Sequence, residues 1–362
     1  MKVKNYKVLQ MCLLSVFVFV GCSDTGDSYY ASTDFLKVPK IDVHFHYNTT
    51  DIGYIKFADS LNFRFVSPNV DAGESLNRQL QVSSVLKRKF PDQFTFLGTF
   101  SVEGFGKPDF ASNIIFRIDS CLKLGASGIK IWKNIGMVLK DSTGKYVMAD
   151  NPNFDAIYNY LESNNIPLMA HLGEPKNCWL PLDQMTLDND KNYFTNHPEY
   201  HMFLHPEAPS YEAQVEVRDN ILKKHPQLNF IGAHLGSLEW NIEELAKRLD
   251  QFPNFNVDFS ARIGHLQYQS SKDYKRVRQF MVKYQDRLLY GTDGSLSDNI
   301  SNAKAKMNSL HKGWLEQFIY LATDQFVIVK DLGGLKVQGL QLPREVVDKI
   351  YSKNAVRLLG MK

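Results

Sequence analysis

The sequence predicts an α/β protein of the (β/α)8, or TIM-barrel, class, and three observations support this prediction. From residue 40 onward, short β-branched apolar runs alternate with longer amphipathic runs, which is typical of parallel strands joined by crossover helices. Eight such apolar runs within 362 residues suit one closed barrel. The first run is not followed by the glycine-rich phosphate turn of a doubly wound open sheet, which is the alternative architecture.

Each expected strand is a short apolar run with turn-forming or polar residues on both sides. The eight runs are 40–47, 63–70, 94–100, 127–132, 166–172, 229–235, 255–261 and 287–293. Helices are expected at 71–90, 109–124, 152–164, 209–225, 239–251 and 272–285, with a weaker one at 54–61.

Two long segments interrupt this alternation. One covers 174–208 after the fifth strand, and the other covers 295–342 after the eighth. In a barrel both follow C-terminal strand ends, where active sites lie. We therefore expect a single domain with two long loops, which either form a lid or pack on the barrel rim.

The N-terminus predicts export. Three lysines within the first seven residues precede an apolar run that is too short to cross a bilayer, as in a secretory signal peptide. The run ends in VFVGCS, which resembles a bacterial lipobox and implies lipid attachment to Cys22. An ordinary signal peptide with an incidental cysteine is the alternative. We expect a signal peptide at 1–21, a flexible tether at 22–39, and a barrel domain at 40–362 anchored at the bacterial cell envelope, in a leaflet left open.

The composition limits the possible partners and the redox chemistry. The chain has 42 basic and 39 acidic residues and a formal charge of +3, which gives no argument for nucleic-acid binding. Beyond the signal and the anchor, only Cys121 and Cys178 remain. Two buried, unpaired thiols are expected, although the sequence leaves a disulfide between them open. The expected partners are a small-molecule substrate and the membrane, reached through the lipid.

Polar side chains gather where the predicted strands end. In IDVHFHYN, two histidines one position apart share a strand face, because strand side chains alternate. If the strands form a barrel, all of these ends meet at one mouth. The residues concerned are His44, His46, Lys130, His171, His234 and Asp293.

This set of side chains suits a catalytic metal. Imidazole and carboxylate groups bind divalent transition metals, and a catalytic site needs about three protein ligands with one position left for water. We expect zinc, with manganese as the alternative, and either one ion or two.

The pieces DVHFH, GIKIW, LMAHLGEP, FIGAHLG and YGTDGS resemble the amidohydrolase superfamily, in particular its amidohydrolase-related branch of metal-dependent TIM-barrel hydrolases and decarboxylases. The likeness runs from about residue 40 to the end of the chain. It implies that His44, His46, His171 and Asp293 hold the metal and that Asp293 accepts a proton from the attacking water. It implies a catalytic role for His234 in one-metal relatives and a ligand role in two-metal relatives.

Other residues are candidates for substrate contacts. Lys130 matches the position of a carboxylated, metal-bridging lysine in two-metal relatives, or it acts as an amine that contacts a substrate carboxylate. Arg262, after the seventh strand, can grip a carboxylate or form a rim salt bridge. Glu174 and Trp179, in the segment after the fifth strand, are further candidate substrate contacts.

The sequence therefore predicts a metal-dependent hydrolase whose activated water attacks an amide, lactone or ester carbon of a small molecule. The first alternative is a metal-dependent, non-oxidative decarboxylase of an aromatic or unsaturated acid. The second is an exported lipoprotein that binds a ligand without turnover.

Overall fold

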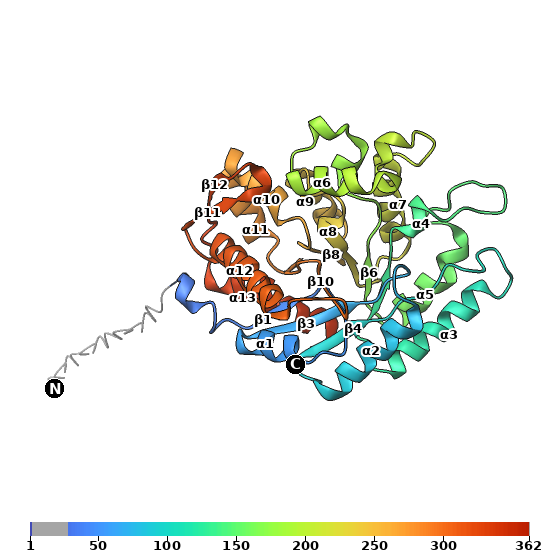
Figure 1. The fold of residues 1–362 in the computed structure, drawn as a ribbon, viewed down its shortest axis with the longest axis horizontal. Helices are drawn as coiled ribbons and strands as arrows, with labels where there is room; N and C mark the ends of the chain where they lie inside the picture. Colours follow the sequence, from blue (N-terminus) through green and yellow to red (C-terminus); the bar gives the residue numbers. More distant parts are fainter. Residues whose placement is uncertain (2–27, 362) are drawn as a thin grey trace.

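The computed structural model of this protein describes Met1 and residues 28–361 (Figure 1). Parallel strands lie at the centre of the fold and helices surround them. Residues 2–27 lie outside the described residues, and with them Cys22 and nearly all of the predicted signal peptide. Within residues 28–361, no helix combines the length and apolar composition that crossing a membrane requires.

All eight predicted strands are present in the described part of the chain. They are β1 (Lys40–Asp42), β2 (Phe45–Asn48), β3 (Phe63–Pro68), β4 (Phe94–Leu97), β5 (Ile129–Ile131), β6 (Leu168–Ala170), β7 (Phe230–Gly232), β8 (Phe255–Asp258), β9 (Leu288–Leu289) and β10 (Gly294–Ser297). The first predicted strand is divided by a bend at Val43 and His44, and the eighth is shorter than predicted and is followed by β10.

The strands pair in parallel and follow the chain order around the fold. The pairs form the sheets β1-β3-β4, β5-β6-β7-β8-β9 and β10-β2. A parallel bridge between Gly98 and Ile129 joins β4 to β5, and the Val43 amide donates to the Tyr290 carbonyl at 3.0 Å between the last and first strands. The architecture is therefore of the TIM-barrel type, although its strands fall into separate sheets rather than one continuous ladder.

A compact apolar cluster fills the space enclosed by the strands. It takes one side chain each from β1, β3, β4, β6, β7 and β9 and several from the C-terminal segment, whereas the larger cluster lies between the strands and the helices. Phe65 and Val66 illustrate the division, since these neighbours point to opposite faces and belong to different clusters. The inner cluster consists of Ile41, Val43, Val66, Leu97, Met169, Ile231, Ala233, Leu289, Ala355, Leu358, Leu359 and Met361.

Helices follow the strands, and the seven predicted ones are present. They are α1 (Gly53–Ser60), α2 (Leu76–Lys89), α3 (Phe110–Lys123), α5 (Asp155–Ser163), α7 (Tyr211–Lys224), α9 (Ile242–Gln251) and α11 (Tyr274–Lys283). Side-chain caps begin several of them: Ser75 accepts from the Arg78 amide, and Asn241 accepts from the Glu243 amide. The helices not predicted individually are α4 (Asn134–Met137), α6 (Asp188–Asn196), α8 (Ala233–Gly236), α10 (Ile263–Lys272), α12 (Ala303–Ala322), α13 (Arg344–Asp348) and α14 (Asn354–Leu359).

The segment 295–342, predicted to be a long loop, is mostly regular structure. It holds the 20-residue helix α12 and an antiparallel hairpin of β11 (Phe326–Val329) and β12 (Leu335–Gln338). Trp314 of α12 is 2% exposed, and its ring stacks on Phe63 of β3 with centroids 4.3 Å apart. This part of the prediction is wrong because α12 covers the outside of the strands, as the other barrel helices do.

The described part of the predicted tether is packed against the domain. Phe35 is 3% exposed and its ring lies 5.5 Å from Phe318 of α12, while Val38 is 1% exposed. Apolar burial therefore holds these residues in place, and residues 28–39 are not a free linker. The thiols of Cys121 and Cys178 are both buried and free, which confirms the expectation that they do not pair.

Replacement of Trp314 by alanine tests the role of α12. Because the ring is buried between α12 and β3, we expect Trp314→Ala to reduce the free energy of unfolding by about 3–5 kcal/mol. Chemical denaturation followed by circular dichroism measures this change. Phe116→Ala is the control, since Phe116 is 74% exposed and should change stability by no more than about 0.5 kcal/mol. Equal effects of the two variants would contradict the packing described here.

Candidate active site

A cavity of about 350 Å³ opens where β2, β5, β6, β7 and β8 end. Its walls include eight of the predicted site residues: His44, His46, Lys130, His171, Glu174, His234, Arg262 and Asp293. A larger cavity of about 600 Å³ beside α2 and α3 contains none of them. The chemistry predicted from the sequence therefore converges on one cavity.

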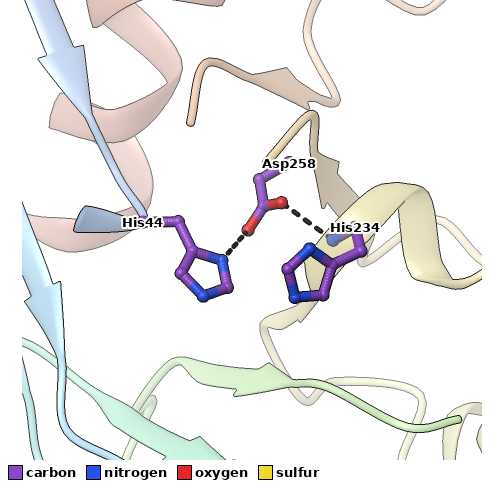
Figure 2. Close-up of side chains that lie close together, drawn as sticks. All are labelled: His44, His234 and Asp258. Atoms are coloured by element: carbon purple, nitrogen blue, oxygen red, sulfur yellow. Dashed lines mark hydrogen bonds and ion pairs between the residues drawn. The ribbon is translucent and has the colours of Figure 1, made fainter. Parts of the chain in front are cut away.

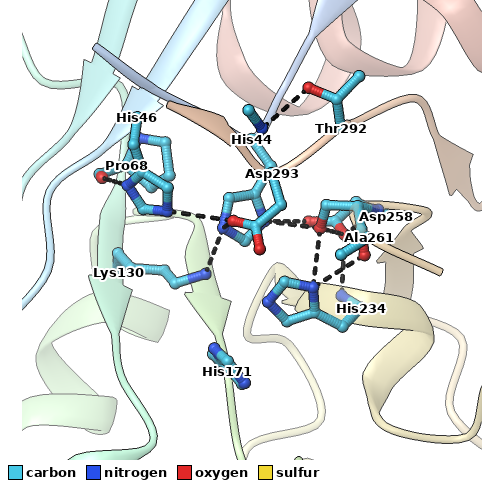
Figure 3. A network of polar contacts seen from close by, with 12 residues as sticks. His44, His46, Pro68, Lys130, His171, His234, Asp258, Ala261, Thr292 and Asp293 are labelled. Atoms are coloured by element: carbon cyan, nitrogen blue, oxygen red, sulfur yellow. Dashed lines mark hydrogen bonds and ion pairs between the residues drawn. The ribbon is translucent and has the colours of Figure 1, made fainter. Parts of the chain in front are cut away.

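His44 lies in the bend that separates β1 from β2, His46 lies on β2, and both rings present their Nε2 atom to the cavity (Figure 3). The Nδ1 atom of His46 lies 3.0 Å from the Pro68 carbonyl, and Nδ1 of His44 lies 3.0 Å from Oδ2 of Asp258. Since carbonyl and carboxylate oxygens accept, Nδ1 carries the proton in both rings. Both Nε2 atoms therefore keep a lone pair for a ligand.

Asp293 faces these two nitrogens. Its Oδ1 atom lies 3.5 Å from Nε2 of His44 and 3.3 Å from Nε2 of His46. Burial by itself raises the pKa of Asp293, but the facing His46 ring, followed by the nearby His234 and His44, holds that pKa well below its ordinary value. The carboxylate is therefore charged at neutral pH.

Asp258 is a site residue that the sequence analysis missed (Figure 2). It is fully buried, and its Oδ1 atom accepts from the amides of His234 at 2.9 Å and Ser260 at 3.0 Å. Burial alone raises the pKa of Asp258, but the adjoining His44 ring brings it below the ordinary value. An aspartate within the predicted strand FNVDFSA was the available signal, because an acid in a buried strand needs partners.

His234 lies directly after β7 in a left-handed backbone conformation, with φ 59°. Its Nδ1 atom donates to the Ser260 carbonyl at 2.9 Å, so Nε2 keeps the lone pair. Burial is the main cause that lowers the pKa of His234 well below its ordinary value, and the neighbouring His171 lowers it further. The ring is therefore neutral and can accept a proton at Nε2.

His171 lines the same cavity but stands apart from the closest ligand atoms. Its ring centroid lies 4.2 Å from that of His234, and burial lowers its pKa to about 4. The two compact groups of candidate ligands within the described residues are His44–His46–Asp293 and His44–His234–Asp258, and neither includes His171. Its buried Nε2 atom has no hydrogen-bond partner, although Oε2 of Glu174 lies 3.4 Å away.

Lys130 extends from β5 toward the histidines. Its Nζ atom lies 3.3 Å from Nε2 of His44, and burial lowers the pKa of its amine to about 8. The amine therefore lies at the centre of the site, next to a candidate metal ligand.

A second polar group forms the opposite wall of the cavity. Lys133, which the sequence analysis did not single out, pairs closely with Oε1 of Glu174 and lies 3.2 Å from the Tyr193 hydroxyl. Burial alone lowers the pKa of Lys133, but Glu174 and then Tyr193 raise it above its ordinary value. The guanidinium of Arg262 lies 3.8 Å from Oε2 of Glu174, and its buried Nε atom has no hydrogen-bond partner.

The segment 174–208 supplies part of this wall. Asp190 and Tyr193, both from α6, line the cavity and were not predicted as site residues. Trp179, predicted as a substrate contact, is not in the cavity wall: its indole donates to the Pro209 carbonyl at 3.3 Å and its ring lies 5.5 Å from that of Tyr211. Which side chains of a long insertion reach a cavity depends on its backbone path, which no local pattern specifies.

The donor set fits a divalent metal ion. Two imidazole lone pairs and a charged carboxylate oxygen lie within 4.8 Å of one another, and acceptors this close repel unless a cation lies between them. Nitrogen and oxygen donors of this kind suit zinc or manganese. The Nε2 atom of His171 is a further buried nitrogen without a hydrogen-bond partner among the described residues.

The fold and the site define a class: a TIM-barrel-type protein with candidate histidine and aspartate ligands for a metal at the C-terminal strand ends. The chain belongs to the amidohydrolase family, whose model matches residues 103–361. Membership supports a metal-dependent hydrolase in general. The match begins beyond His44 and His46, so these two residues are assigned to the site by their geometry.

Several solved structures are similar over most of their length, but weakly. A protein of Agrobacterium tumefaciens shares 10% identity, with 90% of this chain and 94% of that chain covered and a TM-score of 0.43. An amidohydrolase of Pseudomonas aeruginosa shares 12% identity, with 91% of this chain and 98% of that chain covered and a TM-score of 0.42. An N-isopropylammelide isopropylaminohydrolase of Burkholderia multivorans shares 11% identity, with 90% of this chain and 75% of that chain covered and a TM-score of 0.41. These scores are too low to carry an argument, and no curated protein matches the sequence.

Metal content tests the donor set. We expect the purified protein to contain a divalent metal by elemental analysis, and His46→Ala to lose most of it on dialysis because one of three converging donors is removed. Asp258→Asn should weaken metal affinity about 10–100-fold, since Asp258 orients the His44 ring. His197→Ala is the control, because that side chain is 47% exposed and is not in the cavity wall. Equal metal retention in all three variants would contradict the assignment.

Asp190 should make a pH-dependent contribution to stability. It bonds Asn177 at 2.8 Å and His265 at 3.2 Å. Burial alone raises the pKa of Asp190, but His265, Arg262 and Asn177 lower it below 3.8. A carboxylate whose pKa is lowered by folding stabilises the protein above its unfolded-state pKa, and this stability is lost as the pH falls through the folded-state value.

We therefore expect Asp190→Asn to reduce the free energy of unfolding at neutral pH by about 1–3 kcal/mol. The difference from the wild type should stay constant down to a pH of about 4 and shrink below it. Urea denaturation at several pH values measures it. Asp183→Asn, an exposed acid in the same segment, is the matched control. A difference that grows on acidification would contradict this account.

Proposed function

We propose that this protein hydrolyses an amide, lactone or ester bond of a small molecule with the aid of one divalent ion, zinc. The observation that carries the proposal is the convergence of His44, His46 and Asp293 on a cavity of about 350 Å³. The family supports hydrolysis in general. We further infer that the strands act as one closed (β/α)8 barrel, because hydrogen bonds join the last strand to the first.

His44, His46 and Asp293 would hold the ion, and His171 would complete the set through its unpartnered Nε2. When bound, the ion would polarise the scissile carbonyl and increase the acidity of water. Oδ1 of Asp293 contacts both imidazoles, which leaves Oδ2 to accept a proton. His234 accepts a proton at Nε2 and, once protonated, can donate a hydrogen bond to a developing oxyanion.

The opposite wall of the cavity supports a substrate that carries a carboxylate. Arg262 is 6% exposed and has an unpartnered Nε, so a bound carboxylate would supply the acceptor that it lacks. The Lys130 amine, next to His44, would act as a hydrogen-bond donor to the substrate. Glu174 pairs with Lys133 and would set the position of this wall rather than bind an anion.

The same Arg262 favours one second candidate function, the non-oxidative decarboxylation of an aromatic or unsaturated acid. Such a substrate also carries a carboxylate, and the Tyr193 ring lines the cavity beside it. The two functions differ in their products, which are an acid and carbon dioxide respectively.

We also propose that the protein is exported and attached to a membrane of the bacterial cell envelope through a lipid on Cys22. The support for this is the lipobox-like VFVGCS in the sequence.

The decisive experiment is an assay of the full chain, loaded with zinc or manganese, against lactones, N-acyl compounds, esters and aromatic acids. We expect metal-dependent acid release, lost on treatment with a chelator. Asp293→Asn should lower kcat about 10²–10⁴-fold, because the proton acceptor is removed. Asp298→Asn, an exposed acid on the same rim, is the control and should leave kcat unchanged.

The other outcomes separate the alternatives. Carbon dioxide release without hydrolysis would replace the proposed function with the decarboxylase. Tight binding of panel members by the metal-loaded protein without any product would indicate a ligand-binding lipoprotein.

A further inference from the structure

The hairpin β11–β12 presents apolar side chains to solvent on one face. Phe326 is 56% and Ile328 is 58% exposed, while the alternating Val327, Val329 and Val337 are buried against the domain. Lys336 lies opposite Ile328 and Gln338 opposite Phe326. We call Phe326, Ile328, Lys336 and Gln338 the hairpin face. Two large, neighbouring apolar side chains left exposed on a strand favour a contact with something outside the domain.

The N-terminal segment enters the fold beside this face. The side-chain amide of Gln325, the residue before β11, donates to the Ser32 hydroxyl at 3.2 Å. Ser28, the first residue described after the gap, accepts from the Arg344 amide at 3.1 Å. Five residues lie between Cys22 and Ser28 in the sequence, so the two are at most about 20 Å apart even when this segment is fully extended.

We propose that the hairpin face docks on the lipid surface to which Cys22 is attached. This inference rests on the proposed lipid attachment, because the short reach from Cys22 holds the hairpin next to the bilayer. In this arrangement Phe326 and Ile328 enter the interfacial region, where aromatic and apolar side chains are favoured. Lys336, whose Nζ lies 4.4 Å from the Phe326 ring centroid, extends toward anionic headgroups.

The chemistry of the face fits lipid better than an isolated protein contact. None of its four residues is acidic, so nothing on it repels an anionic bilayer. Two exposed apolar side chains are too few to bind a membrane stably alone, but a second attachment makes their docking effectively intramolecular. The segment η7 (Lys330–Leu332), between β11 and β12, contacts α6 of the cavity wall. Docking of the hairpin would therefore also orient the cavity relative to the membrane.

An environment-sensitive probe tests the docking. The full, acylated chain is placed in vesicles of phosphatidylcholine and phosphatidylglycerol, with Ile328→Cys labelled by a nitrobenzoxadiazole dye. The thiols of Cys121 and Cys178 are 1% and 0% exposed and should not react in the folded protein. Phe116→Cys is the matched control, because it replaces an exposed apolar side chain on α3, on the opposite side of the fold (Figure 1). We expect a blue shift and quenching by spin-labelled lipids at 328 and neither at 116.

The possible failures are distinguishable. Mass spectrometry of the N-terminal peptide that shows no lipid on Cys22 overturns both the anchor and the docking that rests on it. A lipid on Cys22 with a water-like spectrum at 328 overturns the docking alone. A blue shift that needs no vesicles and increases with protein concentration would show that a second copy covers the face. None of these results bears on the proposed hydrolysis, which is assayed with small molecules.

Discussion

The hydrogen bond between His44 and Asp258 is the interaction on which the site depends. It joins the bend after β1 to the end of β8, two segments that lie 214 residues apart in the sequence. Because Asp258 accepts a hydrogen bond from Nδ1–H of His44, the opposite nitrogen of the ring keeps its lone pair for a metal. The same carboxylate also accepts from the backbone amide of His234, which helps to hold that residue in its left-handed conformation. One buried acid therefore positions two functional histidines.

A fully buried carboxylate such as Asp258 stays charged only because hydrogen-bond donors surround it. Asp258 accepts from two amides, one imidazole and the Ser260 hydroxyl, and its full burial would otherwise favour the neutral acid. Removing one donor leaves an unsatisfied buried charge, whereas removing an exposed ion pair changes little. The site is therefore rigid where ligands must converge, and this rigidity comes from hydrogen bonds rather than from apolar packing alone.

The sequence predicted the strands and most of the converging side chains because both follow local rules. Apolar alternation marked all eight strands, and parallel strands in sequence order bring their C-terminal ends together, which is why His44, His46, His234 and Asp293 were found before any coordinates. The bend at Val43 and His44 was not predicted. There the Asp42 carboxylate accepts from the His44 amide, two residues away, and from the Thr292 amide, 250 residues away, and the second contact has no local signal. Helix α12 was also missed, because length and spacing alone did not distinguish a covering helix from a loop.

The cavity has two halves, which depend on different parts of the chain. In the metal-donor half, His46 lies on the paired strand β2, while His44 and His234 are held through Asp258, so its geometry tolerates little change. The opposite half depends on Lys133, Glu174 and Tyr193. It also depends on α6, which is held in place by the contact between Asp190 and His265. Changes in that segment would alter the shape and charge presented to the substrate while leaving the donors in place. In the proposed hydrolase, the groups that would hold the metal and the groups that would select the substrate therefore come largely from different parts of the chain.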